Sequence, residues 1–381
     1  MSKLKELIKE LCPNGVPYLE LKDVLVIKNG KDYKKLSKGK YPVYGSGGIM
    51  TYVSDYLYDK PSVLIPRKGS IDKLYYTEEP FWNVDTIFYT DIDTTKVIPR
   101  YVYFCLQSEH LEQYNTAGGV PSLTQKVLNK VMLPVPPLEV QREIVRVLDT
   151  FTLLTAELTA ELTARKKQYE FYRDKLLTIN SNIEMVELGD VCDFVRGPFG
   201  GALKKEIFQT DGYAVYEQQH AIYRNLDFRY FIDKNKFSEL KRFAVKPGDM
   251  IISCSGTIGK TFVIPESAPE GVINQALLKL TPNDDLDVFY LQYFFENTIS
   301  KILNGVARGG AIKNVPAVSE LKAIKLPLPP LDVQRRLVKV LDNFEAICTD
   351  LNIGLPAEIE ARQKQYEYYR DKLLFFKELQ K

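Results

Sequence analysis

Apolar and aromatic residues recur at steps of three and four along two long segments of the chain, the spacing of one helix face. In the second segment the pattern breaks at Gly354 and Pro356, which predicts that one helix stops there and another begins. The stripe of the first segment, Leu138–Leu177, runs through Val147, Phe151, Leu154, Leu158, Leu162, Arg165, Tyr169, Tyr172 and Leu176. Two such helices most simply pack on each other, so we predict an antiparallel, coiled-coil-like pair. The alternative is that each stripe packs only on its neighbouring domain.

Elsewhere the pattern shortens to apolar runs of four or five residues between glycine-rich turns, which is typical of short strands in mixed α/β domains. The clearest strands are predicted at Ser62–Pro66, Thr86–Thr90, Met250–Cys254 and Gly271–Asn274. Short helices are predicted at Pro99–Ser108 and Asp287–Phe295.

The chain also repeats itself. Residues 133–149 (LPVPPLEVQREIVRVLD) match residues 326–342 (LPLPPLDVQRRLVKVLD) at 12 of 17 positions. Residues 165–177 and 362–374 share 11 of 13 positions around the sequence QYE-x-YRDKLL, and a weaker opening motif occurs at 19–24 and 186–191. The helical parts match and the regions between them differ, so a duplicated scaffold carries two divergent modules.

These repeats predict a mixed α+β fold with a pseudo-two-fold internal repeat. We expect two α/β modules joined by two long helices. The predicted boundaries are 1–132 for the first module with a short N-terminal helix, 133–181 for the central helical region, 182–325 for the second module, and 326–381 for the C-terminal helical region.

Composition is that of an ordinary globular protein, with 45% hydrophobic and 26% charged residues. The net charge is only +2, so any nucleic-acid surface must come from local clusters of basic residues. No apolar stretch is long enough for a transmembrane helix or a signal peptide, so we expect a cytoplasmic protein without membrane contact. The five scattered cysteines and two histidines have no metal-ligand spacing, so we expect no metal site and reduced, mostly buried thiols.

The segment Ser255–Thr261 (SGTIGKT) approaches the phosphate-binding loop of nucleotide hydrolases. That motif requires a glycine where this chain has Cys254. An NTPase using Lys260 and Thr261 is therefore the alternative interpretation. We favour a polar loop that contacts a phosphate backbone or base edges.

Basic residues cluster in loops of both modules, next to small residues and amides that suit DNA contacts. The amides of Gln218 and Gln219 are of the type that reads adenine. The full set of expected DNA-contacting residues is Lys31, Lys34, Lys35, Tyr44, Ser46, Arg67, Lys68, Ser70, Arg196, Lys204, Gln218, Gln219, His220, Ser253, Ser255, Thr257, Lys260, Arg308 and Lys313.

Taken together, the duplicated Pro-Pro-Leu-x-x-Gln and QYE-x-YRDKLL motifs, with the twin Thr-Ala-Glu-Leu unit at 155–162, resemble the specificity subunits of type I restriction-modification systems. The resemblance implies that each module is a target-recognition domain for one half of a bipartite double-stranded DNA sequence. It further implies that the helices set the unspecified spacer.

The resemblance also implies partners. Two methylation subunits would dock around the helices and bring S-adenosylmethionine. Two restriction subunits, where the cell has them, would bring ATP- and Mg-dependent chemistry. This chain would then hold no catalytic residue, metal or cofactor. The residues expected to face a partner are Gln141, Arg142, Arg173, Gln334, Arg335 and Arg370. A helical scaffold that binds no DNA is a further alternative.

The twin unit gives a prediction. Deleting Thr159–Leu162 removes about one helical turn, or about 6 Å, from the first helix. The recognised spacer should shorten while both half-site sequences stay the same, which mapping the recognised DNA motif would reveal. A change in either half-site would contradict the idea that the helix acts as a ruler.

Overall fold

The computed structural model describes all residues except 1, 116–117, 178–182, 200, 307–315 and 380–381. The chain divides into two compact units. Unit 1 comprises Met1–Glu161 with Ala357–Lys381, and unit 2 comprises Leu162–Pro356. Each unit therefore contains one mixed module and parts of both helical regions. The four-part division by role stays a prediction.

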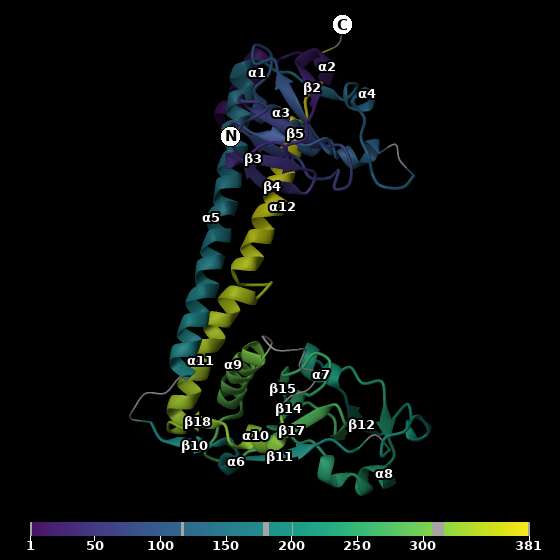
Figure 1. The fold of residues 1–381 in the computed structure, drawn as a ribbon, viewed down its shortest axis with the longest axis vertical. Coiled ribbons are helices and arrows are strands. Elements are labelled where there is room, and N and C mark those ends of the chain that lie inside the picture. Colours follow the sequence, from purple (N-terminus) through teal and green to yellow (C-terminus); the bar gives the residue numbers. More distant parts are fainter. Residues whose placement is uncertain (1, 116–117, 178–182, 200, 307–315, 380–381) are drawn as a thin grey trace. The chain divides into compact units, whose positions relative to one another are not determined.

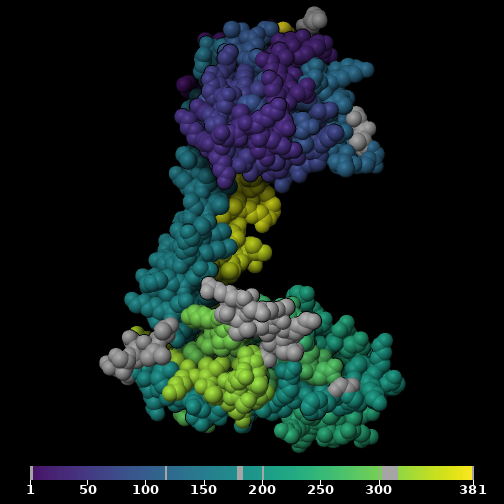
Figure 2. Space-filling model, in the orientation of Figure 1, coloured from purple at the N-terminus to yellow at the C-terminus, as the bar shows by residue number. Residues whose placement is uncertain are grey.

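The module of unit 1 contains a four-stranded sheet of order β2-β8-β5-β6 and a three-stranded sheet of order β4-β3-β7. Its strands are β1 (Tyr18–Glu20), β2 (Leu25–Asn29), β3 (Lys38–Gly45), β4 (Gly48–Val53), β5 (Ser62–Pro66), β6 (Tyr75–Thr77), β7 (Trp82–Asn83), β8 (Ile87–Ile92) and β9 (Met132–Pro134). Its helices are α1 (Ser2–Leu11), α2 (Leu21–Val24), α3 (Pro99–Ser108) and α4 (Gln125–Leu128). In Figure 2 the purple and blue residues of this module form one continuous body.

The module of unit 2 contains sheets of order β11-β17-β14-β15 and β13-β12-β16. Its strands are β10 (Met185–Glu187), β11 (Cys192–Arg196), β12 (Tyr213–Tyr216), β13 (Phe231–Ile232), β14 (Met250–Ser253), β15 (Thr261–Val263), β16 (Gly271–Ile273), β17 (Leu277–Pro282) and β18 (Lys325–Pro327). Its helices are α6 (Leu188–Val191), α7 (Gln218–Tyr223), α8 (Lys234–Glu239), α9 (Val288–Val306) and α10 (Val318–Lys322).

The two modules share one topology despite their divergent sequences. In the larger sheet, the first strand along the chain pairs antiparallel with the last, as β2 with β8 and β11 with β17. The smaller sheet contains one parallel pair in each case, β3 with β7 and β12 with β16. Each opening motif pairs with a Pro-Pro motif in a short ribbon, β1–β9 or β10–β18. The duplication therefore extends through the variable regions.

The long helices form where the sequence predicts them. The first is α5 (Leu138–Leu177), and the second helical region contains α11 (Leu331–Thr349) and α12 (Leu355–Leu374). The break at Gly354 and Pro356 is confirmed, because five residues (350–354) separate the end of α11 from the start of α12, and Pro356 lies in the first turn of α12.

Within each unit two helices pack side by side and antiparallel, which confirms the predicted helix-on-helix packing (Figure 1). In unit 1 the Phe151 ring of α5 stacks on Tyr369 of α12, with centroids 5.4 Å apart. In unit 2 Tyr172 of α5 meets Phe344 of α11 at 6.2 Å. The stripe is not buried along its whole length, since Leu154 is 41% exposed.

The glutamine of the first Pro-Pro motif ties α5 to the module of unit 1. Gln141 is fully buried. Its Oε1 accepts from the backbone N–H of Ile98 (2.8 Å), at the start of α3. Its Nε2 donates to the carbonyls of Lys96 (3.0 Å) and Pro136 (2.8 Å). One side chain thus fixes the start of α3 against the start of α5.

The second copy repeats this joint. Gln334 is fully buried, accepts from the Asp287 N–H (2.8 Å), and donates to the carbonyls of Asp285 (2.9 Å) and Pro329 (2.8 Å). A tyrosine supports each joint from the module's helix: Tyr101 donates to the Pro134 carbonyl and Tyr290 to the Pro327 carbonyl. We call the two arrangements around Gln141 and Gln334 the glutamine joints.

The QYE-x-YRDKLL motifs hold the same module helices further along, with the two copies exchanged. The second motif, on α12, contacts α3, and the first motif, on α5, contacts α9. In unit 1 Tyr366 of α12 donates to Gln107 of α3 (2.9 Å), and Ser108 donates to Asp371 (3.0 Å). In unit 2 the Asn297 amide of α9 donates to Asp174 of α5 (2.7 Å). Each module is thus clamped by the start of one helical copy and the end of the other.

We expect Gln141→Ala to destabilise unit 1 by about 2–4 kcal/mol, because three hydrogen bonds are lost around a buried site. Gln334→Ala should do the same to unit 2. Trp82 is the only tryptophan and lies in unit 1, so its fluorescence during denaturant unfolding reports that unit alone. Circular dichroism reports both units.

Gln141→Ala should move the tryptophan transition, and Gln334→Ala only the circular-dichroism one. Exposed Arg142→Ala is the control. Equal stability of Gln141→Ala and the control would refute the structural role of the joint.

Candidate nucleic-acid interface

Four loops of unit 1 meet at one end of its two sheets. The backbone N–H of Lys31, after β2, donates to the Asn83 carbonyl (2.8 Å). Thr86, before β8, accepts from the N–H of Ser46 through its hydroxyl (3.4 Å) and from the N–H of Arg67 through its carbonyl (2.8 Å). Three of the predicted basic or polar loops are therefore brought together around the β7–β8 connection.

The corresponding loops of unit 2 meet in the same way. After β11, the N–H of Gly197 donates to the Leu277 carbonyl (3.0 Å), and the N–H of Cys254, after β14, donates to the Ala276 carbonyl (2.9 Å). Gln218, after β12, donates its amide to the Ser255 carbonyl and accepts from the Ser255 hydroxyl (3.2 Å). Equivalent ends of the two folds thus present the candidate loops.

Two equivalent glycines allow this convergence. A Cβ at Gly30 would lie 2.2 Å from the Val84 carbonyl oxygen, and a Cβ at Gly197 would lie 1.8 Å from the Asn274 oxygen. Both obstacles are main-chain atoms and cannot rotate away. The first loop of each module can pass the sheet edge only because no side chain stands there.

In unit 1 the predicted residues divide by exposure. Tyr44 is half-buried against Tyr75 and Phe81, and burial raises the pKa of its hydroxyl. The half-buried Arg67 guanidinium lies 5.8 Å from the centre of the Phe88 ring. Ser46 and Ser70 are also half-buried, whereas the exposed residues are Lys31, Lys34, Lys35 and Lys68.

In unit 2 four predicted residues are exposed: Arg196, Lys204, Thr257 and Lys260. Ser255 is half-buried. Arg308 and Lys313 lie outside the described residues. The assignment of these exposed and half-buried residues to DNA contacts stays a prediction.

The structure corrects two of the expected DNA contacts. His220 is fully buried, its ring nitrogens lie 3.1 Å from the Glu217 and Asp227 carbonyls, and burial lowers its pKa. Ser253 is fully buried and donates to the Thr257 carbonyl (2.7 Å). Both side chains shape the loops from inside because their polar atoms are used within the module.

The two glutamine amides are also already engaged. Gln218 bonds Ser255 through both amide atoms, and Gln219 donates to the Asp227 carbonyl (3.2 Å). A bidentate contact with adenine would require each amide to leave these partners. Their predicted role as free readers of adenine is therefore not supported.

The alternative of an NTPase fails on geometry. A phosphate-binding loop joins a strand to a helix. The loop around Lys260 instead joins β14 to β15. Thr261 is fully buried and its hydroxyl donates to Glu296, so it is not free to hold a metal ion.

Three of the six residues expected to face a partner are buried instead. Gln141 and Gln334 form the glutamine joints. Arg370 is 8% exposed, donates to its neighbour Asp371 (2.8 Å), and lies over the Tyr366 ring. These three predictions were wrong, because the polar groups of these residues bind partners within the chain.

The other three expected partner residues remain available to different degrees. Arg142 and Arg335 keep 63% and 69% of their side chains exposed. Arg173 is half-buried, lies over the Tyr169 ring, and lines a cavity of about 240 Å³ in unit 2 together with Lys260 and Glu296.

Sequence reasoning missed an exposed aromatic in each helical copy. Phe171 and Tyr368 occupy the same place in the two QYE-x-YRDKLL motifs and are 61% and 59% exposed. Lys175 and Lys372, one turn later, place their ammonium groups 6.0 and 5.3 Å from these rings. A signal was available in the sequence. Tyr169 and Tyr172 belong to the predicted stripe and Phe171 does not, so Phe171 lies off the face that packs on another helix.

Among the described residues, no three potential metal-ligating side chains lie together. Within the same ranges, no helix has the length and apolar character needed to cross a membrane. All five cysteines are free and buried, as predicted, and burial raises the pKa of Cys254 to about 11.

The chain thus carries two modules of one topology, with different polar loops, on a duplicated helical frame. The chain belongs to the type I restriction-modification DNA specificity family, whose domain model matches residues 13–165 and 180–361. It is a DNA-recognition subunit, and the specificity role of this family is non-catalytic.

The chain is similar to curated relatives over most of its length. A putative type I restriction enzyme specificity subunit of Haemophilus influenzae is 33% identical, over 92% of this chain and 93% of that protein. A type I restriction enzyme specificity subunit of Escherichia coli is 32% identical, over 75% of this chain and 73% of that protein.

Solved structures share the fold. The specificity subunit of Mycoplasma genitalium aligns with a TM-score of 0.54 at 15% identity, covering 94% of this chain and 96% of that one. A chain from a type I restriction-modification complex aligns with a TM-score of 0.64 at 16% identity, covering 95% and 98%.

Proposed function

We propose that each module reads one half of a bipartite double-stranded DNA target. The observation that carries this proposal is the convergence of four loops at equivalent ends of two modules that share one topology but differ in loop sequence. Exposed lysines such as Lys34 and Lys35 suit phosphate contacts, which hold the register. The polar and small residues near the sheet ends suit base edges.

In this proposal the helices set the spacer between the half-sites, and α5 contributes through its two Thr-Ala-Glu-Leu units. Catalysis belongs to partner subunits that bring S-adenosylmethionine for methylation, and ATP and Mg for restriction where that subunit is present. The complex works in the cytoplasm, where its DNA lies.

We further propose that two methylation subunits dock on the chain, one for each copy of the QYE-x-YRDKLL motif. Exposed aromatic residues are enriched at the centres of protein interfaces. Phe171 and Tyr368 repeat such a residue with the same lysine beside it, once in each unit. A surface that occurs twice supports one kind of partner bound twice. Two restriction subunits would join the same assembly.

The first experiment is genome-wide mapping of adenine methylation in cells that express the cognate methylation subunit with and without this chain. A split motif should appear only with the chain, giving both half-sites and the spacer. Absence of any chain-dependent motif, with the partner shown to be bound and active, would argue for a scaffold that reads no DNA.

The docking proposal predicts stepwise loss of partner. Phe171→Ala and Tyr368→Ala should each weaken one docking site by about 2 kcal/mol or more, as expected for a central aromatic residue. Native mass spectrometry should then find one methylation subunit on each single variant and none on the double variant. Phe375→Ala is the control, since Phe375 is 83% exposed but lies outside the repeated motif. Two bound subunits on the double variant would refute this docking site.

A further inference from the structure

We propose that Thr261, Glu296 and Arg224 form a positioning hub that fixes the loop 254–260 and thereby determines how the second half-site is read. The inference rests on the proposed function, in which this loop faces DNA. None of the three residues needs to touch a base. They act by holding the loop that does.

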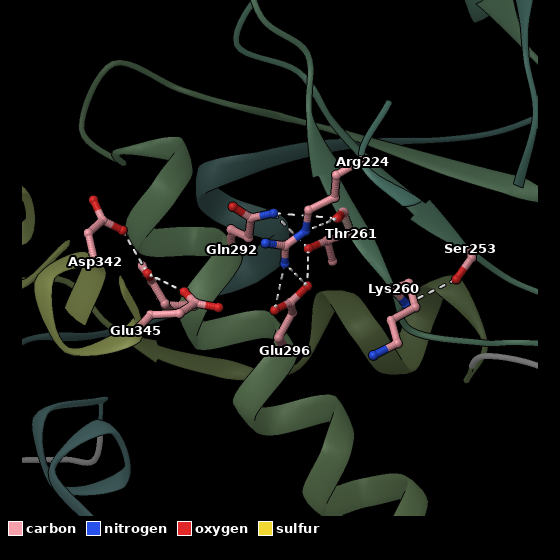
Figure 3. A network of polar contacts seen from close by, with 9 residues as sticks. Arg224, Ser253, Lys260, Thr261, Gln292, Glu296, Asp342 and Glu345 are labelled. Atoms are coloured by element: carbon pink, nitrogen blue, oxygen red, sulfur yellow. Dashed lines mark hydrogen bonds and ion pairs between the residues drawn. The ribbon is translucent and has the colours of Figure 1, made fainter. Parts of the chain in front are cut away.

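Thr261 is the centre of the hub (Figure 3). It is the first residue of β15 and is fully buried. Its hydroxyl donates to Glu296 Oε1 and accepts from Gln292 Nε2 (2.9 Å), both on α9. Its carbonyl accepts from Arg224 Nε (3.3 Å) at the end of α7. The side chain and the main chain of one residue thus connect the base of the loop to two helices.

Glu296 and Arg224, which both bond Thr261, also bond each other. The guanidinium of Arg224 donates to both carboxylate oxygens of Glu296, at 2.9 and 3.2 Å. An exposed ion pair alone contributes little to stability. Here the same carboxylate also satisfies the buried hydroxyl of Thr261, so its removal leaves a buried donor without its acceptor. Arg224 is held with φ of 52°, a left-handed conformation that non-glycine residues seldom adopt.

The rest of the loop is fixed from inside. Ser253 donates to the Thr257 carbonyl (2.7 Å) and accepts from the Lys260 N–H (2.9 Å). At the other end of α7, Gln218 holds Ser255. Helix α7 therefore grips the loop at both of its own ends, through Gln218 and Arg224. The outward residues Thr257 and Lys260 remain exposed on a loop whose inner face is fully engaged.

The hub is attached to the helical frame through α9. Tyr293, one turn before Glu296, donates to Asp342 (2.7 Å) and Glu345 (2.9 Å) of α11. Figure 3 labels these two acceptors. Through α9, the loop 254–260 is therefore tied to α11, the helix that also carries Gln334 of the glutamine joint.

Unit 1 uses the equivalent position differently. Tyr101 and Tyr290 mark the same place in α3 and α9, so Gln107 corresponds to Glu296. Gln107 donates to Tyr103 (2.8 Å) and accepts from Tyr366 (2.9 Å), which are residues of α3 and α12. Neither of these hydrogen bonds joins Gln107 to the loop after β5. The first half-site therefore serves as an internal control for the second.

The test uses the full chain in complex with its methylation subunits, on the bipartite target that methylation mapping identifies. Binding is measured to three duplexes: the intact target, one with a changed base pair in the first half-site, and one with a changed base pair in the second. Thr261→Val keeps the shape but removes the hydroxyl. We expect discrimination at the second half-site to fall about tenfold or more, with discrimination at the first unchanged.

Thr261→Ser restores the hydroxyl and should restore discrimination, which a purely steric role would not require. Glu296→Gln and Arg224→Ala should both lower second-site discrimination, and they keep the test open if Thr261→Val fails to fold. Glu266→Gln is the matched control, because it is the same substitution at an exposed loop position of unit 2. Circular-dichroism melting verifies that each variant is folded.

Two failures can be told apart. If Ser255→Ala combined with Thr257→Ala leaves the second half-site reading intact, the loop does not read DNA and the proposed function of the loop fails. If that pair changes the reading while folded Thr261→Val, Glu296→Gln and Arg224→Ala keep full discrimination, the loop reads DNA without the hub, and the present inference is overturned.

Discussion

Everything else in this molecule depends on the crossed clamp around one helix of each module. In unit 1, α3 is held by the start of α5 through Gln141 and by the end of α12 through Tyr366. In unit 2, α9 is held by the start of α11 through Gln334 and by the end of α5 through Asp174. Buried polar groups with every partner supplied are costly to disturb. The module and the helical pair of each unit therefore behave as one body, and the candidate DNA-contacting loops take a fixed orientation from that body.

The two modules show how a shared frame can carry different recognition surfaces. The sheets, the parallel strand pair and the glycine at the first loop are the same in both. The loops differ in charge and in how they are fixed. Unit 1 presents a run of exposed lysines after β2, whereas unit 2 presents a short loop after β14 whose inner face is saturated with hydrogen bonds. Phosphate attraction requires charge and little order, and base reading requires order. The modules differ in how they combine these two requirements.

The sequence predicts the repeated elements best. The bounds of α3, α5 and β5 agree with the prediction, because helix periodicity and apolar runs are local signals. Helix α9 is longer than predicted, and the sheet order could not be derived, since it depends on pairing between distant strands. The errors at Gln141, Gln334 and Arg370 have one cause. A repeated polar residue indicates that the two copies share a role, but the sequence does not say whether its side chain is buried or faces a partner. Glu296 gave no signal, because its partners Thr261 and Arg224 are remote along the chain.

The two glutamines of the joints hydrogen-bond to their modules through main-chain atoms. Gln141 bonds the N–H of Ile98 and the carbonyl of Lys96, and Gln334 bonds the N–H of Asp287 and the carbonyl of Asp285. These glutamine hydrogen bonds require no particular side chain at the positions that they contact. The same glutamine could therefore hold a module of different sequence, provided that the module's helix begins with the same backbone geometry and keeps the supporting tyrosine.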